Sequence, residues 1–152
     1  MKSITKPSLL ENLGGLLRVW AIPPEVILIT GRTIAISSQT NVIKLYCIED
    51  TANFTREKKK DNGNDYYDVI VSGVTLCKTS ADEEILQELE QKKWVVIFED
   101  GNNLFKIAGT PTERLTFLSD EDSGKSTSDR NQVFFKFIGK IIARPFFITD
   151  PF

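Results

Sequence analysis

Short runs of β-branched and aromatic residues, separated by turn residues, recur along most of the chain. Runs of about four to eight such residues, bounded by glycine, proline, asparagine or aspartate, are typical of β-strands. The pattern predicts strands over Leu16–Ile22, Val26–Thr30, Thr33–Ser37, Val42–Ile48, Thr51–Lys60, Tyr67–Leu76, Trp94–Glu99, Leu104–Ala108, Leu115–Leu118 and Val133–Ala143.

Turn residues between neighbouring runs indicate tight hairpins. Gly31-Arg32 separates the second and third runs, Asp61–Asn64 separates the fifth and sixth, and Asp100–Asn103 separates the seventh and eighth. Glycine and asparagine tolerate the positive φ angles that such turns require. Neighbouring strands are therefore expected to pair antiparallel.

One segment, from about Ala81 to Lys92, has helical periodicity instead. Ser80 is placed to cap it, and acidic residues follow in the first turn, where the helix dipole favours negative charge. Ile85, Leu86 and Leu89 make one narrow apolar stripe. A helix with a single apolar stripe is expected to pack on a sheet.

About nine or ten strands and one long helix, without repeats or an internal linker, predict a mainly β fold. We expect an antiparallel β-sandwich or barrel with one flanking α-helix at about residues 81–92. The 152 residues suit a single domain, 1–152, with a short N-terminal lead-in and an apolar C-terminal tail from Pro145 to Phe152.

Composition narrows the function classes. Hydrophobic residues make up 41% and charged residues 26%, as in globular proteins, and the formal net charge is −2. No global positive field is present to hold nucleic acid or an anionic membrane.

Glu11 and Arg18 interrupt the N-terminal leucines, and no apolar run approaches the roughly 18 residues of a membrane span. We expect neither a secretion signal nor a membrane segment.

The residues of an enzyme active site are missing from the pattern. There is no histidine, the commonest general base and metal ligand. The string Ser123–Thr127 resembles the end of a phosphate-binding loop, but Ser119 stands where that motif needs glycine. Cys47 and Cys77 sit in apolar stretches and are expected to be buried free thiols. No catalytic activity, metal, cofactor or small-molecule substrate is predicted.

A basic run, Arg56–Lys60, lies beside Phe54, Tyr66 and Tyr67 at a predicted hairpin tip. A solvated hairpin is favoured, because lysines keep strand edges soluble. A protein contact through Lys58, Lys59 and Lys60 is the second interpretation. Nucleic-acid binding through interleaved aromatic rings is the third, and specific binding of this kind is not expected.

Two further segments suggest contacts between copies. The polar stretch Ser119–Asn131 contains no apolar residue, whereas the tail Ile141–Phe152 is too apolar for a free terminus. The tail either docks on a neighbouring copy or folds back on its own core, and both alternatives stay open. The candidate assembly contacts are Lys58, Lys59, Lys60, Asp129, Arg130, Phe146, Phe147 and Phe152.

Three stretches carry a family resemblance. They are Gly14-Gly15 leading into Arg18–Ile22, then Trp94–Asn102 with Ala108–Thr110, and Ser128–Asn131 with Phe135–Lys140. Together they are similar to small structural proteins encoded in the tail modules of phages and prophages of Bacteroidetes-type bacteria, of the tail-tube or tail-completion class. The resemblance implies a β-sandwich or barrel with a flanking helix that assembles as a ring or stacked rings in a virion, beside other virion proteins.

The alternative is a sandwich-type binding module for carbohydrate or a surface receptor. Such a module needs an exposed aromatic platform, and Tyr46, Tyr66, Tyr67 and Trp94 are the candidates for it.

Overall fold

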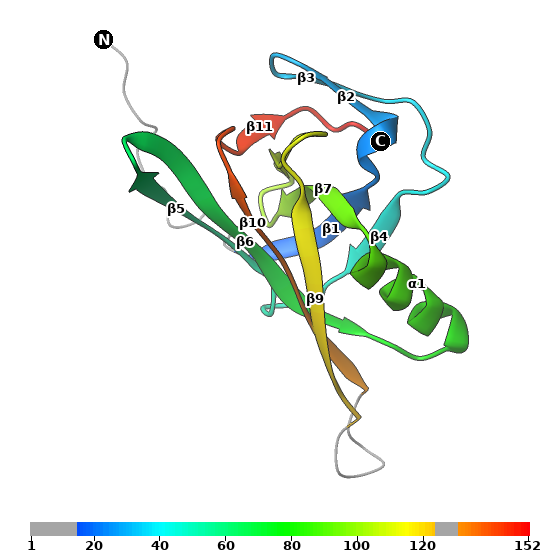
Figure 1. The fold of residues 1–152 in the computed structure, drawn as a ribbon. Helices are drawn as coiled ribbons and strands as arrows, with labels where there is room; N and C mark the ends of the chain where they lie inside the picture. The colour runs from blue at the N-terminus through cyan, green and yellow to red at the C-terminus, as the bar shows by residue number, and fades with distance from the viewer. Residues whose placement is uncertain (1–14, 124–130) are drawn as a thin grey trace.

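The computed structural model describes residues 15–123 and 131–152 (Figure 1). Every strand pair recorded in these residues is antiparallel, and one α-helix accompanies the strands, which confirms the predicted mainly β fold. The elements are β1 (Leu16–Ile22), the 3-10 turn η1 (Pro24–Val26), β2 (Ile27–Thr30), β3 (Thr33–Ile36), β4 (Ile43–Tyr46), β5 (Asn53–Asp61), β6 (Asn64–Leu76), α1 (Ser80–Gln91), β7 (Lys93–Asp100), β8 (Phe105–Ala108), β9 (Leu115–Asp122), β10 (Gln132–Ile141) and β11 (Phe146–Ile148).

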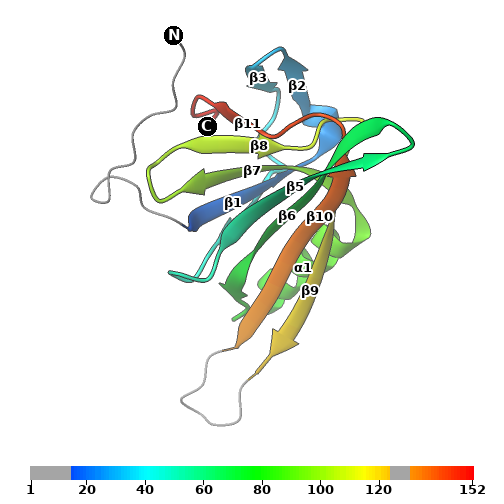
Figure 2. The same ribbon diagram turned by 90° about the vertical axis from the view of Figure 1, so that its left-hand side faces the viewer.

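Nine of these strands form one sheet that is folded into two halves. The β7 half has the order β11–β8–β7–β1–β4, and the β10 half has the order β9–β10–β6–β5. In residues 15–123 and 131–152, two residue pairs between strands β7 and β9 join the halves, Lys93 with Thr116 and Trp94 with Leu115. Figure 2 shows β8, β7 and β1 crossing the direction of β6 and β10, as in orthogonally packed sheets.

The main core lies between the two halves. Alternate residues of each strand point inward, because successive side chains of a strand face opposite sides of the sheet. The rings of Phe117, Phe135 and Phe137 contact one another there, with centroids 5.0 to 6.2 Å apart. Leu115 and Val71 are fully buried beside them. These three rings come from two adjacent strands of the β10 half, β9 and β10.

Helix α1 begins at Ser80, one residue earlier than predicted. Thr79, and not Ser80, is the N-cap: its hydroxyl accepts the backbone N–H of Asp82, whose carboxylate accepts the N–H of Thr79 in return. This reciprocal capping box satisfies two otherwise orphaned donors. With twelve residues, α1 is too short to span a membrane, and no helix in the described residues is long and apolar enough to do so.

Two of the three residues predicted to pack the helix on the sheet do so. Leu86 and Leu89 are buried in the main core, whereas Ile85 is 41% exposed and borders a surface groove. Trp94 at the start of β7 is fully buried, and its Nε1–H donates to the carbonyl of Leu89 over 2.9 Å. That bond ties the last turn of α1 to the sheet.

A second, smaller core covers the far face of the β7 half, and the sequence pattern did not reveal it. Trp20, Ile22, Val95, Ile97 and Ile107 point to this face. The β2–β3 hairpin and the C-terminal tail lie over them (Figure 1). The domain therefore has three layers: the β10 half, the β7 half, and a cover built from two separate parts of the chain.

Strand β9 is longer than predicted. The sequence indicates a strand that ends at Leu118, followed by a polar loop, but β9 continues to Asp122 and pairs with β10 as far as Gln132. Its last residues are exposed because this part of the hairpin projects beyond the core (Figures 1 and 2). Because both faces of this part of the strand are exposed to solvent, its sequence has no alternation of apolar and polar residues from which a strand could be predicted. We call the segment from Ser119 to Asp122 the acidic arm.

Candidate assembly surfaces

The basic run at the tip of the β5–β6 hairpin is neutralised within the hairpin. Lys58 Nζ lies 2.7 Å from Asp65 Oδ2, and Lys59 Nζ lies 2.6 Å from Asp68 Oδ2. These partners raise the pKa of both lysines, through hydrogen bonds first and through charge second. Lys60 is exposed and has no ion pair in the described residues. Two of the three lysines are thus paired within their own hairpin, which is what a solvated tip requires.

The C-terminal tail packs on its own chain. Phe146, Phe147 and Ile148 pair antiparallel with β8, and Phe146 and Ile148 contribute to the second core. Phe152 stacks on Trp20 with ring centroids 4.8 Å apart. Phe147 points the other way and remains 55% exposed. Of the two alternatives for the tail, the structure has the one in which it folds back on its own domain.

Asp129 and Arg130 lie outside the described residues, as do residues 124–127 of the phosphate-loop-like string. The strand β10 begins at Gln132, directly after this segment.

Both edge strands of the β10 half lack a second strand partner over part or all of their length in the described residues, and α1 packs against β9, where Ser119 Oγ donates to Glu90 Oε1 over 2.6 Å. Strand β5 pairs with β6 along its whole length and with no strand on its other side. Beyond Thr116, β9 pairs with β10 alone. The unpaired backbone groups of such edges can bind a strand of another chain. Between the edges, the outer face of this half exposes Ile70, Leu118 and Phe134, each more than 39% accessible.

A cleft opens between the β5 edge and the β8–β11 edge, and we call it the basic–aromatic cleft. Lys106 of β8 lies in it, with its ammonium group 4.3 Å from the ring centre of Phe147 and 5.1 Å from that of Phe54. Arg56 of β5 lies over the ring of Tyr67 at 5.5 Å. A cavity of about 250 Å³ extends beside Phe54, Lys106 and Phe147 toward the β7–β8 turn. Residues far apart in sequence build this site, so the sequence pattern gave no signal of it.

The cations of this cleft have no carboxylate partner. In residues 15–123 and 131–152, no acidic side chain lies within 4.0 Å of Arg56, Lys106 or Arg144. Partial burial lowers the pKa of Lys106, and the nearby charges of Arg56 and Arg144 lower it further. Asp100 lines the same cavity, and its charge acts in the opposite direction on the pKa of Lys106, while its Oδ1 accepts two backbone N–H groups of the β7–β8 turn. Three cations thus stand against one carboxylate, and the net charge around the cleft is positive.

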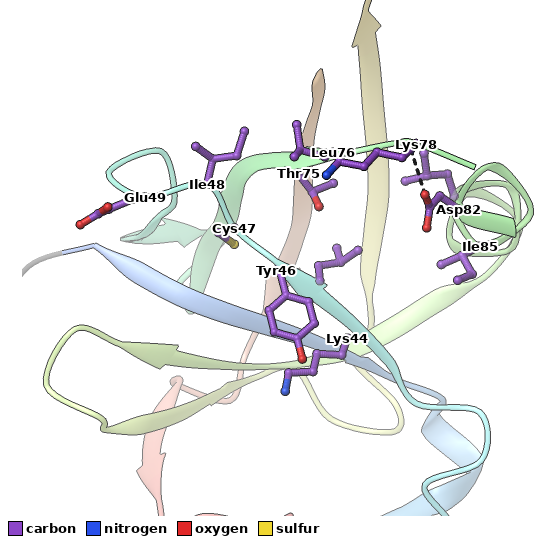
Figure 3. Close-up of a pocket in the computed structure, with 12 residues that line it drawn as sticks. Lys44, Tyr46, Cys47, Ile48, Glu49, Thr75, Leu76, Lys78, Asp82 and Ile85 are labelled. Atoms are coloured by element: carbon purple, nitrogen blue, oxygen red, sulfur yellow. Dashed lines mark hydrogen bonds between the residues drawn. The ribbon is translucent and has the colours of Figure 1, made fainter. Parts of the chain in front are cut away.

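A groove of about 560 Å³ lies between β4, the end of β6 and the first turn of α1 (Figure 3). Tyr46 and Ile85 give it an apolar border, and Asp82 faces it but is held by the helix cap. Burial raises the pKa of the Cys47 thiol to about 12, so this thiol stays protonated and unreactive at neutral pH. These lining residues include no pair of nucleophile and base.

Two other chemistries lack their groups in the described part of the chain. No cluster of three or more histidine, cysteine, aspartate or glutamate residues is placed to hold a metal ion. The four aromatic residues considered for a carbohydrate platform do not form one surface, because Trp94 is fully buried and the neighbours Tyr66 and Tyr67 point to opposite faces of β6.

No protein-family model, curated protein or solved structure matches the chain. Its open edges and its basic–aromatic cleft are therefore the features on which a functional proposal rests.

Proposed function

We propose that this chain is a self-assembling structural protein whose copies join into a closed ring through the two edges of the β10 half. The observation that carries the proposal is the pair of edges without a second strand partner, β5 on one side and β9 from Phe117 to Glu121 on the other. Because the two edges belong to one sheet and differ from each other, each copy can add to the next in the same sense. Such head-to-tail contacts close into a ring when the rotation between neighbouring copies divides a full turn, and otherwise give a filament.

The strand directions suit this addition. The order β9–β10–β6–β5 contains four strands, and each is antiparallel to its neighbour. The two edge strands consequently run in opposite directions. When all copies have the same orientation, β9 of one copy meets β5 of the next in the antiparallel sense, which continues the ladder without interruption. Antiparallel pairs are also slightly more stable per residue than parallel ones.

The parts of the two edges that lack a second strand partner lie at different ends of the sheet. Thr116 and Thr55 are level with each other across the sheet; beyond Thr116 the strand partner of β9 is β10, while β5 runs the other way toward Asp61. Pairing them requires each copy to be offset along the strand direction. Closed sheets need such an offset, because their strands tilt and the register shifts around the ring.

The resemblance to phage tail-module proteins supports a narrower proposal: the ring is a tail-tube component or a tail/neck component of a tailed bacteriophage. In that case the chain resides in the virion and contacts other virion proteins. The exposed outer face at Ile70, Leu118 and Phe134 is apolar enough to be covered in such an assembly. No second function is proposed, because the aromatic platform of a binding module does not form.

Proline substitution in β5 tests the edge pairing. Adjacent residues of an edge strand direct their backbone groups alternately to the partner strand and to the open side. Of Glu57→Pro and Lys58→Pro, one removes a donor to β6 and destabilises the hairpin, while the other removes only a donor on the open side. Thermal unfolding identifies the variant that keeps its bond to β6, because that variant retains the wild-type melting temperature. Sedimentation velocity at high concentration then measures its assembly. We expect the folded variant to stay monomeric where the wild type assembles; unchanged assembly would contradict edge pairing through β5.

A further inference from the structure

The molecule has electrically opposite ends. At one end, the acidic arm of β9 lies near the first turn of α1, where Asp82 and Glu83 are. The pKa of the nearby Cys77 thiol is raised by burial first, and then by the charges of Glu121, Asp82 and Glu83. Asp120 and Glu121 are exposed on the arm. At the other end of the sheet, Lys106 lies in the basic–aromatic cleft, and Arg56 and Arg144 are near enough that their charges add to burial in lowering its pKa.

The cleft is suited to receive carboxylates. Its three cations come from β5, from β8 and from the segment before β11, and they repel one another in the isolated chain. Aromatic rings on both sides of the Lys106 ammonium group keep it partly out of water. A charge–charge contact strengthens where water is partly excluded. An incoming carboxylate would therefore relieve the repulsion and gain more than at an open surface.

From this complementarity we infer that the basic–aromatic cleft of one copy receives the acidic arm of a second copy, with Glu121, whose side chain points to the same face of the sheet as the buried Val133, beside Arg56, Lys106 and Arg144. The inference rests on the proposed self-assembly and specifies its electrostatics. It agrees with the offset that edge pairing requires, because that offset moves the acidic arm along β5 toward the cleft. Contacts of this kind set partner choice and orientation more than they set raw affinity.

A charge-exchange experiment tests the inference. The cleft variant carries Arg56→Glu and Arg144→Glu, which are exposed positions, and leaves the half-buried Lys106 in place. The arm variant carries Asp120→Lys and Glu121→Lys. A control variant carries Arg32→Glu and Lys93→Glu, which are exposed positions outside both surfaces. Circular dichroism establishes that each variant is folded, and sedimentation velocity in low salt measures its assembly.

We expect each of the two surface variants alone to assemble about tenfold more weakly than the wild type or worse, and the control to match the wild type. An equimolar mixture of the cleft and arm variants should regain assembly, because an acidic cleft then meets a basic arm and a basic cleft meets an acidic arm. Added salt should weaken wild-type assembly, since part of the contact is screened.

Two results would overturn the inference while leaving the proposed function standing: assembly that is indifferent to both double substitutions, or variants whose mixture stays as weak as either alone. A wild-type chain that remains monomeric at every concentration would overturn both. Binding of a fluorescent single-stranded DNA that is lost in the cleft variant, without any rescue in the mixture, would assign the cleft to nucleic acid instead.

Discussion

Phe146 and Phe147 are neighbours on β11, yet substitution by alanine should affect them very differently. Phe146 faces the second core and is partly buried, whereas Phe147 points away from it and is 55% exposed. Phe→Ala at a fully buried site costs about 3–5 kcal/mol. Because Phe146 is only partly buried, we expect Phe146→Ala to cost about 2–3 kcal/mol. Phe147→Ala, which removes a contact with Lys106, should cost less than about 1 kcal/mol.

Urea unfolding of the two variants at low protein concentration measures these costs in the monomer. A loss of about 2–3 kcal/mol corresponds to a fall of roughly 5–10 °C in the melting temperature of a domain this size. Comparable small losses in both variants would refute the assignment of the tail to its own core. That outcome would point instead to a tail that is free in the monomer and docks on a neighbour.

Further predictions concern the helix and the thiols. Leu89→Asp should cost about 3 kcal/mol or more in urea unfolding, because it places a charge at a fully buried position of α1. Thr79→Ala should cost about 1 kcal/mol through loss of the helix cap, whereas Ser80→Ala should be nearly neutral. Cys47 should react with iodoacetamide far more slowly than an unfolded-chain thiol at pH 8, and equal rates would contradict its burial. Since the folded pKa of Cys47, about 12, exceeds the ordinary value near 9, its contribution to stability should be full below pH 9 and decline between pH 9 and 12, an effect that Cys47→Ala should remove.

The strands and the helix could be predicted from the sequence where one face of an element is buried. The alternation along β6 and β10 and the stripe through Leu86 and Leu89 follow directly from burial on one side. The acidic arm escaped prediction because both of its faces meet water. Ile85 was predicted to lie in the core because it shares the helical spacing of Leu86 and Leu89. That spacing does not indicate how much of the helix the sheet covers, and Ile85 is 41% exposed.

The surfaces were harder to predict because they depend on long-range pairing. Local sequence shows Arg56–Lys60 as a basic run, but only the register of β5 against β6 places Asp65 and Asp68 opposite Lys58 and Lys59. The reverse holds for Lys106, an unremarkable residue in sequence that the fold places among other cations and aromatic rings. The fold of the tail on β8 likewise depends on a pairing across 40 residues of chain, from Ile107 to Phe146, that no local pattern encodes.

An electron cryo-microscopy map of the assembled protein would show whether neighbouring copies pair through β9 and β5. We expect a closed ring in which β9 of each copy continues antiparallel into β5 of the next, with the acidic arm seated in the basic–aromatic cleft. A protein that stays monomeric at the highest attainable concentration, or an oligomer in which both edges of the β10 half remain in solvent, would contradict it.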